Sequence, residues 1–458
     1  MRNYSLDSFR LFFAFFIVAL HIPFVGNSNL GNLGWESFQF IGHLGVPFFF
    51  VVSGFFAYSS DLKKQSVRLG NQFKKILGLF VASYFLFVAY SMVIEQSFFQ
   101  KISTFTPQNI FNNLIHGWPT FDPILWFLVA QLYIIGLRWL FIKIAILFKA
   151  KRSVFIDWVF LLSGIVGYGL CCLNQTYFPL LGAQTAAKLS DYLNFFTDGL
   201  VFYMVGYFVR KIDSKNPIQK VHAFVVWIVF IVSFFLLVGE YLLSKNILIA
   251  NHQTFFPAFN MMQIIFAFAL LVLLVKYPNI GKFNNSFLGC LISRLGAKVA
   301  VYIYIIHEMV YYILLYMIYP SIWGHKLKVD SFDKYFGICF ITFLVALIVG
   351  AIYAYIKDEI KIAQKFTIEN KSQVKTKVVR NNSMDIMRMV AAFLIVIIHA
   401  AANYTTKGYR TEFSIVQVLR LLAPVAVVYF FALAGYFIYS SSWQVVVNKT
   451  VKQIKKIA

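Results

Sequence analysis

The chain has 458 residues, of which 60% are hydrophobic and only 13% are charged. A soluble domain carries about a quarter charged residues, so this composition excludes an ordinary soluble fold and indicates an integral membrane protein. The formal net charge is +23. The Lys and Arg residues fall in short clusters between apolar runs, which is typical of cytoplasmic loops. We therefore expect membrane lipid as a partner and no nucleic acid.

Apolar runs then give the predicted elements in chain order. A helix needs about 20 apolar residues to cross the hydrocarbon core of a bilayer. Runs near that length predict spans at 8–25, 38–58, 76–96, 124–147, 154–173, 193–209, 221–243, 256–275, 299–320 and 335–356. Two more follow at 386–402 and 419–440. The predicted fold class is all-α integral membrane: a bundle of about ten transmembrane helices plus two further ones.

The loops after every second predicted span are rich in Lys and Arg. By the positive-inside rule these loops are cytoplasmic, which places both termini in the cytoplasm. The first apolar run has no small-residue cleavage site and carries Arg10 and His21, unlike a signal peptide. We therefore expect a multi-pass protein of the cell (inner or plasma) membrane.

The domain organisation follows from a repeat. Residues 1–356 form the first membrane domain, 357–383 a basic cytoplasmic linker, and 384–458 a partial second copy. Asp7, Arg10 and His21 have counterparts in Asp385, Arg388 and His399, with ten residues between Arg and His in both copies. A site built from facing helices cannot be completed by two helices alone, so we expect the second copy to be catalytically silent.

Ionisable residues inside a span are costly and default to functional hypotheses. Arg10 and His21 are eleven residues apart on the first span, which puts them on one face of a helix and about 16 Å apart along its axis. Arg suits phosphate, and His suits general-base work because its pKa lies near neutrality. The alternative for Arg10 is a headgroup contact, paired with Asp7.

The ninth span carries His307 next to Glu308. Neighbouring residues on a helix point about 100° apart, so both are not expected to face one site directly. We expect His307 to face the site, with Tyr304 one turn before it. Asp198 on the sixth span and Gln131 on the fourth are further polar candidates.

Three stretches carry a resemblance to a known family. Asp7, Arg10 and His21 are followed by the run Gly45–Phe56, which contains Ser53 and Gly54; Leu125–Gln131 contains Trp126, and Leu295–His307 ends in Tyr304-Ile305-Ile306-His307. Together they resemble the acyltransferase-3 family of integral membrane acyltransferases, which includes bacterial O-antigen and exopolysaccharide O-acetylases. The resemblance covers roughly residues 1–356, and 384–458 resembles the start of a second such domain.

The resemblance implies an O-acyltransferase with acetyl-CoA as the acyl donor and a glycan or lipid-linked sugar as the acceptor. It implies that Arg10 and His21 are essential to transfer, and we add His307 as a catalytic candidate. Arg10, Lys74 and Lys75 are the expected donor-binding residues. Supporting roles are expected for Asp7, Ser53, Gly54, Trp126, Gln131, Asp198 and Tyr304. Some branches of the family carry acidic residues at the positions of Pro47 and Gln131. This difference concerns the identity of the acyl group and the acceptor more than the class of reaction.

Two other classes remain as alternatives. A secondary transporter also has about twelve spans, but transporters are usually built from two equal repeats rather than ten helices plus two. A glycan polymerase or flippase would be expected to have larger outer loops or more charge within the membrane. The four cysteines show no spacing that suits a metal site or a disulfide framework, so no metal is expected.

Overall fold

The computed structural model describes residues 3–26, 29–93, 98–104, 106–117, 119–120, 122–149, 153–173, 195–250, 259–279, 286–320 and 328–371. Within these ranges the chain is helical and contains no strand. It divides into two compact units, one of Met1–Tyr312 with Lys328–Asp358 and one of Ile313–Leu327 with Glu359–Ala458. The first unit contains every element discussed below except η8 (Ile313–Ile318) and the last part of α15.

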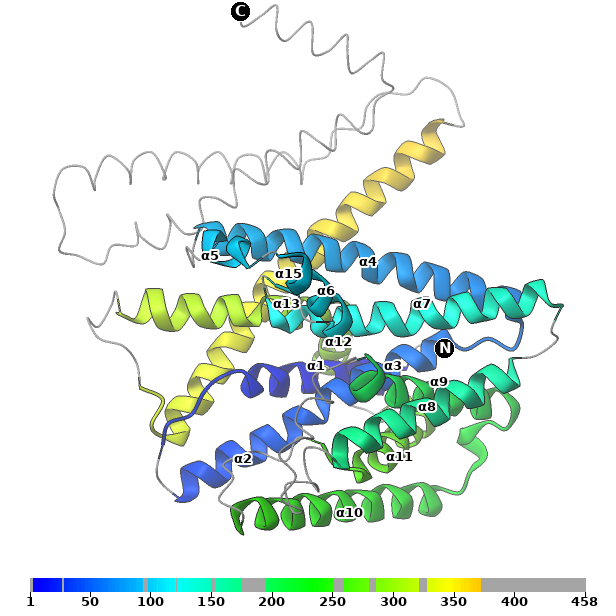
Figure 1. Cartoon of the computed structure of the whole chain (residues 1–458), viewed down its shortest axis with the longest axis horizontal. Coiled ribbons are helices and arrows are strands. Elements are labelled where there is room, and N and C mark those ends of the chain that lie inside the picture. The colour runs from blue at the N-terminus through cyan, green and yellow to red at the C-terminus, as the bar shows by residue number, and fades with distance from the viewer. Residues whose placement is uncertain are drawn as a thin grey trace, which may run out of the picture. The chain divides into compact units, whose positions relative to one another are not determined.

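The first unit opens with α1 (Tyr4–Leu20), α2 (Asn29–His43), α3 (Gly45–Ala57), α4 (Leu62–Val93), α5 (Phe98–Ser103), α6 (Pro107–His116) and η1 (Pro123–Leu125). It continues with α7 (Trp126–Leu147), α8 (Val154–Cys172), η5 (Phe195–Gly199), α9 (Leu200–Lys215), η6 (Ile218–Lys220) and α10 (Ala223–Ala250). The last elements are α11 (Met262–Lys276), α12 (Phe287–Lys298), α13 (Ala300–Tyr312) and α15 (Phe332–Lys371). Within this unit α4 packs beside α7, and α10 beside α11 (Figure 1).

Seven of the described helical segments are long and apolar enough to cross a membrane: Gly31–Ala57, Leu62–Met92, Pro123–Leu147, Val154–Cys172, Ala223–Lys245, Ala300–Ile318 and Phe332–Glu359. The predicted spans 8–25, 193–209 and 256–275 overlap α1, α9 and α11, which have 17, 16 and 15 residues. The all-helical membrane class is confirmed. The predicted count of ten plus two stays a prediction, because 386–402 and 419–440 lie outside the described residues.

The predicted span 38–58 is broken in the middle. The helix ends at His43 and restarts at Gly45, with Pro47 in the first turn of α3. Proline has no N–H and its ring clashes with the carbonyl four residues earlier, here that of His43, so the helix cannot continue through this point. A side chain at Gly42 would meet the Phe16 carbonyl oxygen at 2.7 Å. The break therefore packs directly against α1.

Glycines set the closest helix crossings. A Cβ added to Gly54 would lie 1.8 Å from the Tyr203 carbonyl oxygen, and one added to Gly206 would lie 1.8 Å from that of Val51. At the α1–α12 crossing, a Cβ on Gly296 would lie 1.7 Å from the Asp7 carbonyl oxygen. Small residues of this kind let helix backbones touch inside a membrane. Gly54 thus serves packing, and α1 is held closely at its Asp7 end.

A buried charge network joins α7, α8 and α9. Arg138 Nη2 lies 3.0 Å from Asp157 Oδ1, and neither side chain is exposed. Lys211 Nζ lies 2.6 Å from Asp157 Oδ2, and the Arg138 guanidinium stacks 3.9 Å over the Tyr207 ring. Buried charges are tolerated only when paired in this way. The network fixes the end of α9, on which Arg210 neighbours Lys211.

We predict that Gly206→Ala destabilises the protein by at least the roughly 1–3 kcal/mol typical of overpacking, because the added methyl collides with the α3 backbone. Gly239→Ala is the matched control, since nothing lies within 4 Å of the Cβ position at Gly239. Thermal unfolding in detergent measures both variants. Equal unfolding midpoints for the two would show that the α3–α9 crossing is not as close as described.

Candidate active site

Two histidines from helices far apart in sequence meet in the first unit. His21 caps the C-terminal end of α1, and His307 lies in α13. His307 Nε2 lies 3.1 Å from His21 Nδ1, and the ring centroids are 4.8 Å apart. His307 is fully buried, whereas the His21 side chain is 34% exposed. His21 is therefore the member of the pair that a substrate can reach.

The backbone carbonyls beside the two rings indicate which nitrogen of each ring carries the proton. His21 Nδ1 lies 2.9 Å from the Ile17 carbonyl oxygen, and His307 Nδ1 lies 2.8 Å from that of Tyr304. A carbonyl oxygen only accepts, so both Nδ1 atoms carry the proton. In the neutral pair His307 Nε2 then accepts from His21 Nδ1–H, which it shares with Ile17. The free lone pair is left on His21 Nε2, the atom that can act as a base.

Glu308 also faces His21. Its Oε1 lies 3.7 Å from His21 Nε2. The expectation that only one of His307 and Glu308 would face the site is therefore wrong. The two side chains do diverge on α13, but the His21 ring lies between them and presents a different nitrogen to each.

Asp122 completes the cluster and was not found from the sequence. It caps η1, where its Oδ1 accepts from the Ile124 N–H at 2.9 Å, and its carboxyl group acts electrostatically on that of Glu308. Burial, reinforced by the charge of Glu308, raises the pKa of Asp122 to about 7. The signal in the sequence was Asp122-Pro123, a helix cap directly before the Trp126 stretch.

His43 is a second residue that the sequence analysis did not single out. It ends α2 at the break before α3, and its Nδ1 lies 2.7 Å from the Gln39 carbonyl oxygen. Its charge acts on that of His21. The signal was Gly42-His43-Leu44-Gly45 before Pro47, a pattern that breaks a helix beside an ionisable side chain.

The cluster also offers donors that a metal ion accepts. His21, His307 and Glu308 each present one ligand atom, all within 4.8 Å of one another. Nitrogen and carboxylate donors of this kind suit zinc. The 3.1 Å approach between the rings is, however, that of a hydrogen bond, and His21 Nδ1 already donates to Ile17. The prediction that no metal takes part stays a prediction.

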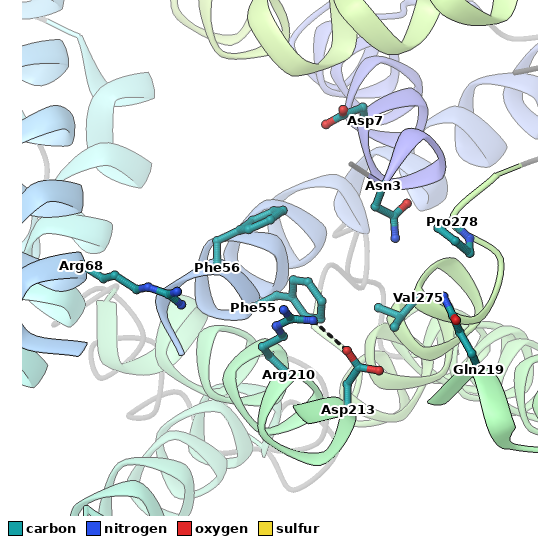
Figure 2. A pocket seen from close by; sticks show the side chains of 10 residues that line it. All are labelled: Asn3, Asp7, Phe55, Phe56, Arg68, Arg210, Asp213, Gln219, Val275 and Pro278. Carbon is teal, nitrogen blue, oxygen red and sulfur yellow. Dashed lines mark hydrogen bonds and ion pairs between the residues drawn. The ribbon is translucent and has the colours of Figure 1, made fainter. Parts of the chain in front are cut away.

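A cavity of about 460 Å³ lies near the opposite end of α1. It is lined by Asn3, Asp7, Phe55, Phe56, Arg68, Arg210, Asp213, Gln219, Val275 and Pro278. Figure 2 shows Arg68 and Arg210 pointing toward this space from α4 and α9, across from Asn3 and Asp7 on α1. A volume of this size lies within the range of small-molecule sites.

Each arginine at the cavity has one fixed partner. Arg210 Nη1 lies 2.7 Å from Asp213 Oδ2, and Arg68 Nη1 donates to the Tyr58 carbonyl oxygen at 2.5 Å. Arg10 is not among the lining residues, but it borders the cavity through Asp7, at 2.7 Å, and the Phe56 ring, 5.4 Å away. A guanidinium has five N–H donors, so Arg68 and Arg210 keep donors for an anion.

The other predicted site residues are scattered. Lys74 and Lys75 are exposed on α4 and do not line the cavity. Ser53 Oγ accepts from Gln72 Nε2 at 2.7 Å, Trp126 begins α7 and Gln131 is buried there. Asp198 in η5 lies 3.8 Å from Cys171 Sγ, in a separate polar cluster. Tyr304 is brought to the site, where its hydroxyl donates to the Ile124 carbonyl beside Asp122.

Comparison with known proteins gives three findings. The sequence profile of an acyltransferase domain, that of the acyltransferase-3 family, matches residues 3–351 and 381–458. An amino-acid racemase from Enterococcus faecalis is 26% identical over 264 residues, which cover 56% of this chain and 34% of that protein. The chain thus spans about a third of the length of that relative. No solved structure matches.

Proposed function

Since this chain belongs to the acyltransferase-3 family and is a membrane acyltransferase, we propose that it moves an acetyl or related acyl group from acyl-CoA to a hydroxyl of a cell-surface or lipid-linked glycan. The observation that carries the proposal is the placement of two different sites along α1. An arginine-lined cavity lies near its Asp7 end and an accessible histidine base lies at its other end. Acyl-CoA is also elongated, with phosphates at one end, as for the cavity, and a thioester at the other, as for the histidine.

The cavity supports binding of the phosphates. Arg68, Arg210 and Arg10 bring three positive charges against the two carboxylates of Asp7 and Asp213. The N-terminus of α1 adds the favourable end of a helix dipole. Aromatic rings flank the cations, with Arg210 5.1 Å from the Phe55 ring. Arg68 and Arg210 are therefore better placed for CoA phosphates than the predicted Lys74 and Lys75.

A second cavity supports a small acyl group. It is apolar, has a volume of about 20 Å³ and is lined by Ile17, Val46, Phe49, Phe127, Val301 and Tyr304. Ile17 lies one turn before His21 on α1, and Tyr304 lies one turn before His307 on α13. A space of this size holds about one water-sized group, which suits the methyl of an acetyl group better than a longer chain.

The reaction then needs one base. His21 Nε2 removes the proton of the acceptor hydroxyl as its oxygen attacks the thioester carbon. The carbon–sulfur bond breaks, and the imidazolium returns the proton to the departing thiolate, so the products are the acyl ester and CoA. His307, which is buried, orients the His21 ring rather than touching substrate.

We propose the same orientation as the loop charges predict. The cavity lies near the α3–α4 and α9–α10 connections, and the start of α4 and the end of α9 beside them are rich in Lys and Arg. By the positive-inside rule this end faces the cytoplasm, where acyl-CoA is made, and both termini lie on that side of the cell membrane. His21 then lies toward the outer face, where a glycan acceptor is found.

We predict that His21→Ala lowers acetyl transfer by about 10²–10⁴-fold, because a general base contributes that much to the rate. The assay uses purified full-length protein in nanodiscs, radiolabelled acetyl-CoA and a lipid and glycan extract of the source cells, with alkali-labile label as the readout. His222→Ala is the matched control, since His222 lies in the connection before α10, remote in sequence from α1 and α13. Wild-type transfer by His21→Ala would refute the proposed base.

We predict that Arg68→Ala and Arg210→Ala each weaken CoA binding by about 10–100-fold, the loss expected for one charge-assisted hydrogen bond. Arg210→Lys should restore binding only in part, because a point charge cannot contact phosphate bidentately. Titration calorimetry with CoA measures the affinities. Lys215→Ala controls for net charge at the same end of α9, and the paired change of Lys74 and Lys75 to Ala should cost less than either arginine. Unchanged affinity in both arginine variants would contradict the placement of the donor.

A further inference from the structure

The carboxyl groups of Asp122 and Glu308 form a pair beside the base. They come from η1 and α13, and each acts electrostatically on the other. A carboxyl group is negative when it is ionised, so the pair carries negative charge whenever either member is ionised. Its charge lies next to the only exposed nitrogen lone pair of the His21–His307 pair, with Glu308 Oε1 3.7 Å from His21 Nε2.

The surrounding contacts hold this pair in place. The Tyr304 hydroxyl donates to the Ile124 carbonyl, which ties η1 to α13. The Ile124 N–H in turn donates to Asp122 Oδ1 at 2.9 Å, so the Asp122 carboxyl has a fixed direction. Tyr304 and Glu308 are one helical turn apart. The same helix, α13, thus places His307 beside one nitrogen of His21 and Glu308 beside the other. Through Tyr304 it also holds the segment that carries Asp122.

Other charged groups face the cluster from neighbouring elements. Lys101 on α5 acts electrostatically on both carboxyl groups. His43 on α2 acts on His21 with the opposite sign to the carboxyl pair. The charge that develops on His21 during transfer is positive. Among the groups named here, only the carboxyl pair opposes that charge with a negative one.

We propose that Asp122 and Glu308 act together as positioning residues of the acyl transfer, with their shared negative charge stabilising the His21 imidazolium while the hydroxyl proton is on Nε2. This inference rests on the proposed function. The pair gains and loses no proton over the cycle. The hydroxyl proton goes to His21 Nε2, the acyl carbon–sulfur bond breaks as the ester bond forms, and the same proton then leaves on the CoA thiol. Removing the pair's charge should therefore slow the chemical step without weakening donor binding at the distant cavity.

The test compares Glu308→Gln and Asp122→Asn, which keep side-chain shape and remove the carboxyl charge, with Asp330→Asn as the matched control. Asp330 is half exposed and pairs with Lys334. We expect Glu308→Gln to lower kcat by about 10²-fold, at the lower end of the range for a general base. The KM for acetyl-CoA, the calorimetric affinity for CoA and the unfolding midpoint should stay at wild-type values. Glu308→Asp should recover part of kcat, which a purely structural role does not predict.

Wild-type kcat in both Glu308→Gln and Asp122→Asn would overturn the inference. A parallel fall in CoA affinity and unfolding midpoint would also overturn it, since the residues would then be structural. If Glu308→Gln does not fold, Asp122→Asn decides alone by the same criteria. His21→Ala is measured beside them: activity in that variant refutes the proposed base, whereas an inactive His21→Ala beside a fully active Glu308→Gln refutes only the carboxyl pair.

Discussion

The contact between His21 and His307 depends on how closely α1 packs against the helices around it. At its Asp7 end α1 touches the backbone of α12 at Gly296, where no side chain fits. At its other end the Gly42–Gly45 break packs against Phe16 and Ile17. The Tyr335 hydroxyl donates to the Ala19 carbonyl at 2.8 Å, one residue before the end of the helix. These contacts fix both the depth and the rotation of α1, and with them the positions of Arg10 and His21.

The charged and polar groups at the two ends of α1 have different environments. Near Asp7 the charges are ion pairs at the edge of an open cavity, where Arg68 and Arg210 keep donors for a ligand. At His21 the groups are fewer, and every ring nitrogen of the two histidines except His21 Nε2 contacts a backbone carbonyl or the other ring. Interactions between charges are stronger where water is excluded. The arrangement suits binding at one end and proton transfer at the other.

Much of this followed from the sequence because it depends on local pattern. Arg10 and His21 stood out because ionisable residues are rare in apolar helices, and together with the Gly45–Phe56, Leu125–Gln131 and Leu295–His307 stretches they carried the resemblance to the family. The partners of His21 did not follow. Glu308 was set aside because neighbouring side chains on a helix point in different directions. The two side chains do diverge, but the His21 ring lies between them and contacts both. Asp122 and His43 come from a helix cap and a helix break, whose positions in space depend on tertiary packing.

Tertiary packing also explains why the proposed donor-binding arginines did not follow from the sequence. Lys74 and Lys75 were favoured because they follow one another at a predicted membrane boundary, but α4 begins at Leu62 and places them on its exposed side. Arg68, one to two turns earlier, and Arg210, at the end of α9, face the cavity instead. Their convergence needs the Arg138–Asp157–Lys211 network that holds α9, and that network spans three helices.

A structure of the protein with a non-hydrolysable acetyl-CoA analogue tests the central claim most directly. The account predicts the phosphates between Arg68 and Arg210, the pantetheine arm along α1, and the acyl carbon beside the small apolar cavity within reach of His21 Nε2. Phosphates bound on the Lys74 and Lys75 face, or an acyl carbon remote from His21, would contradict it.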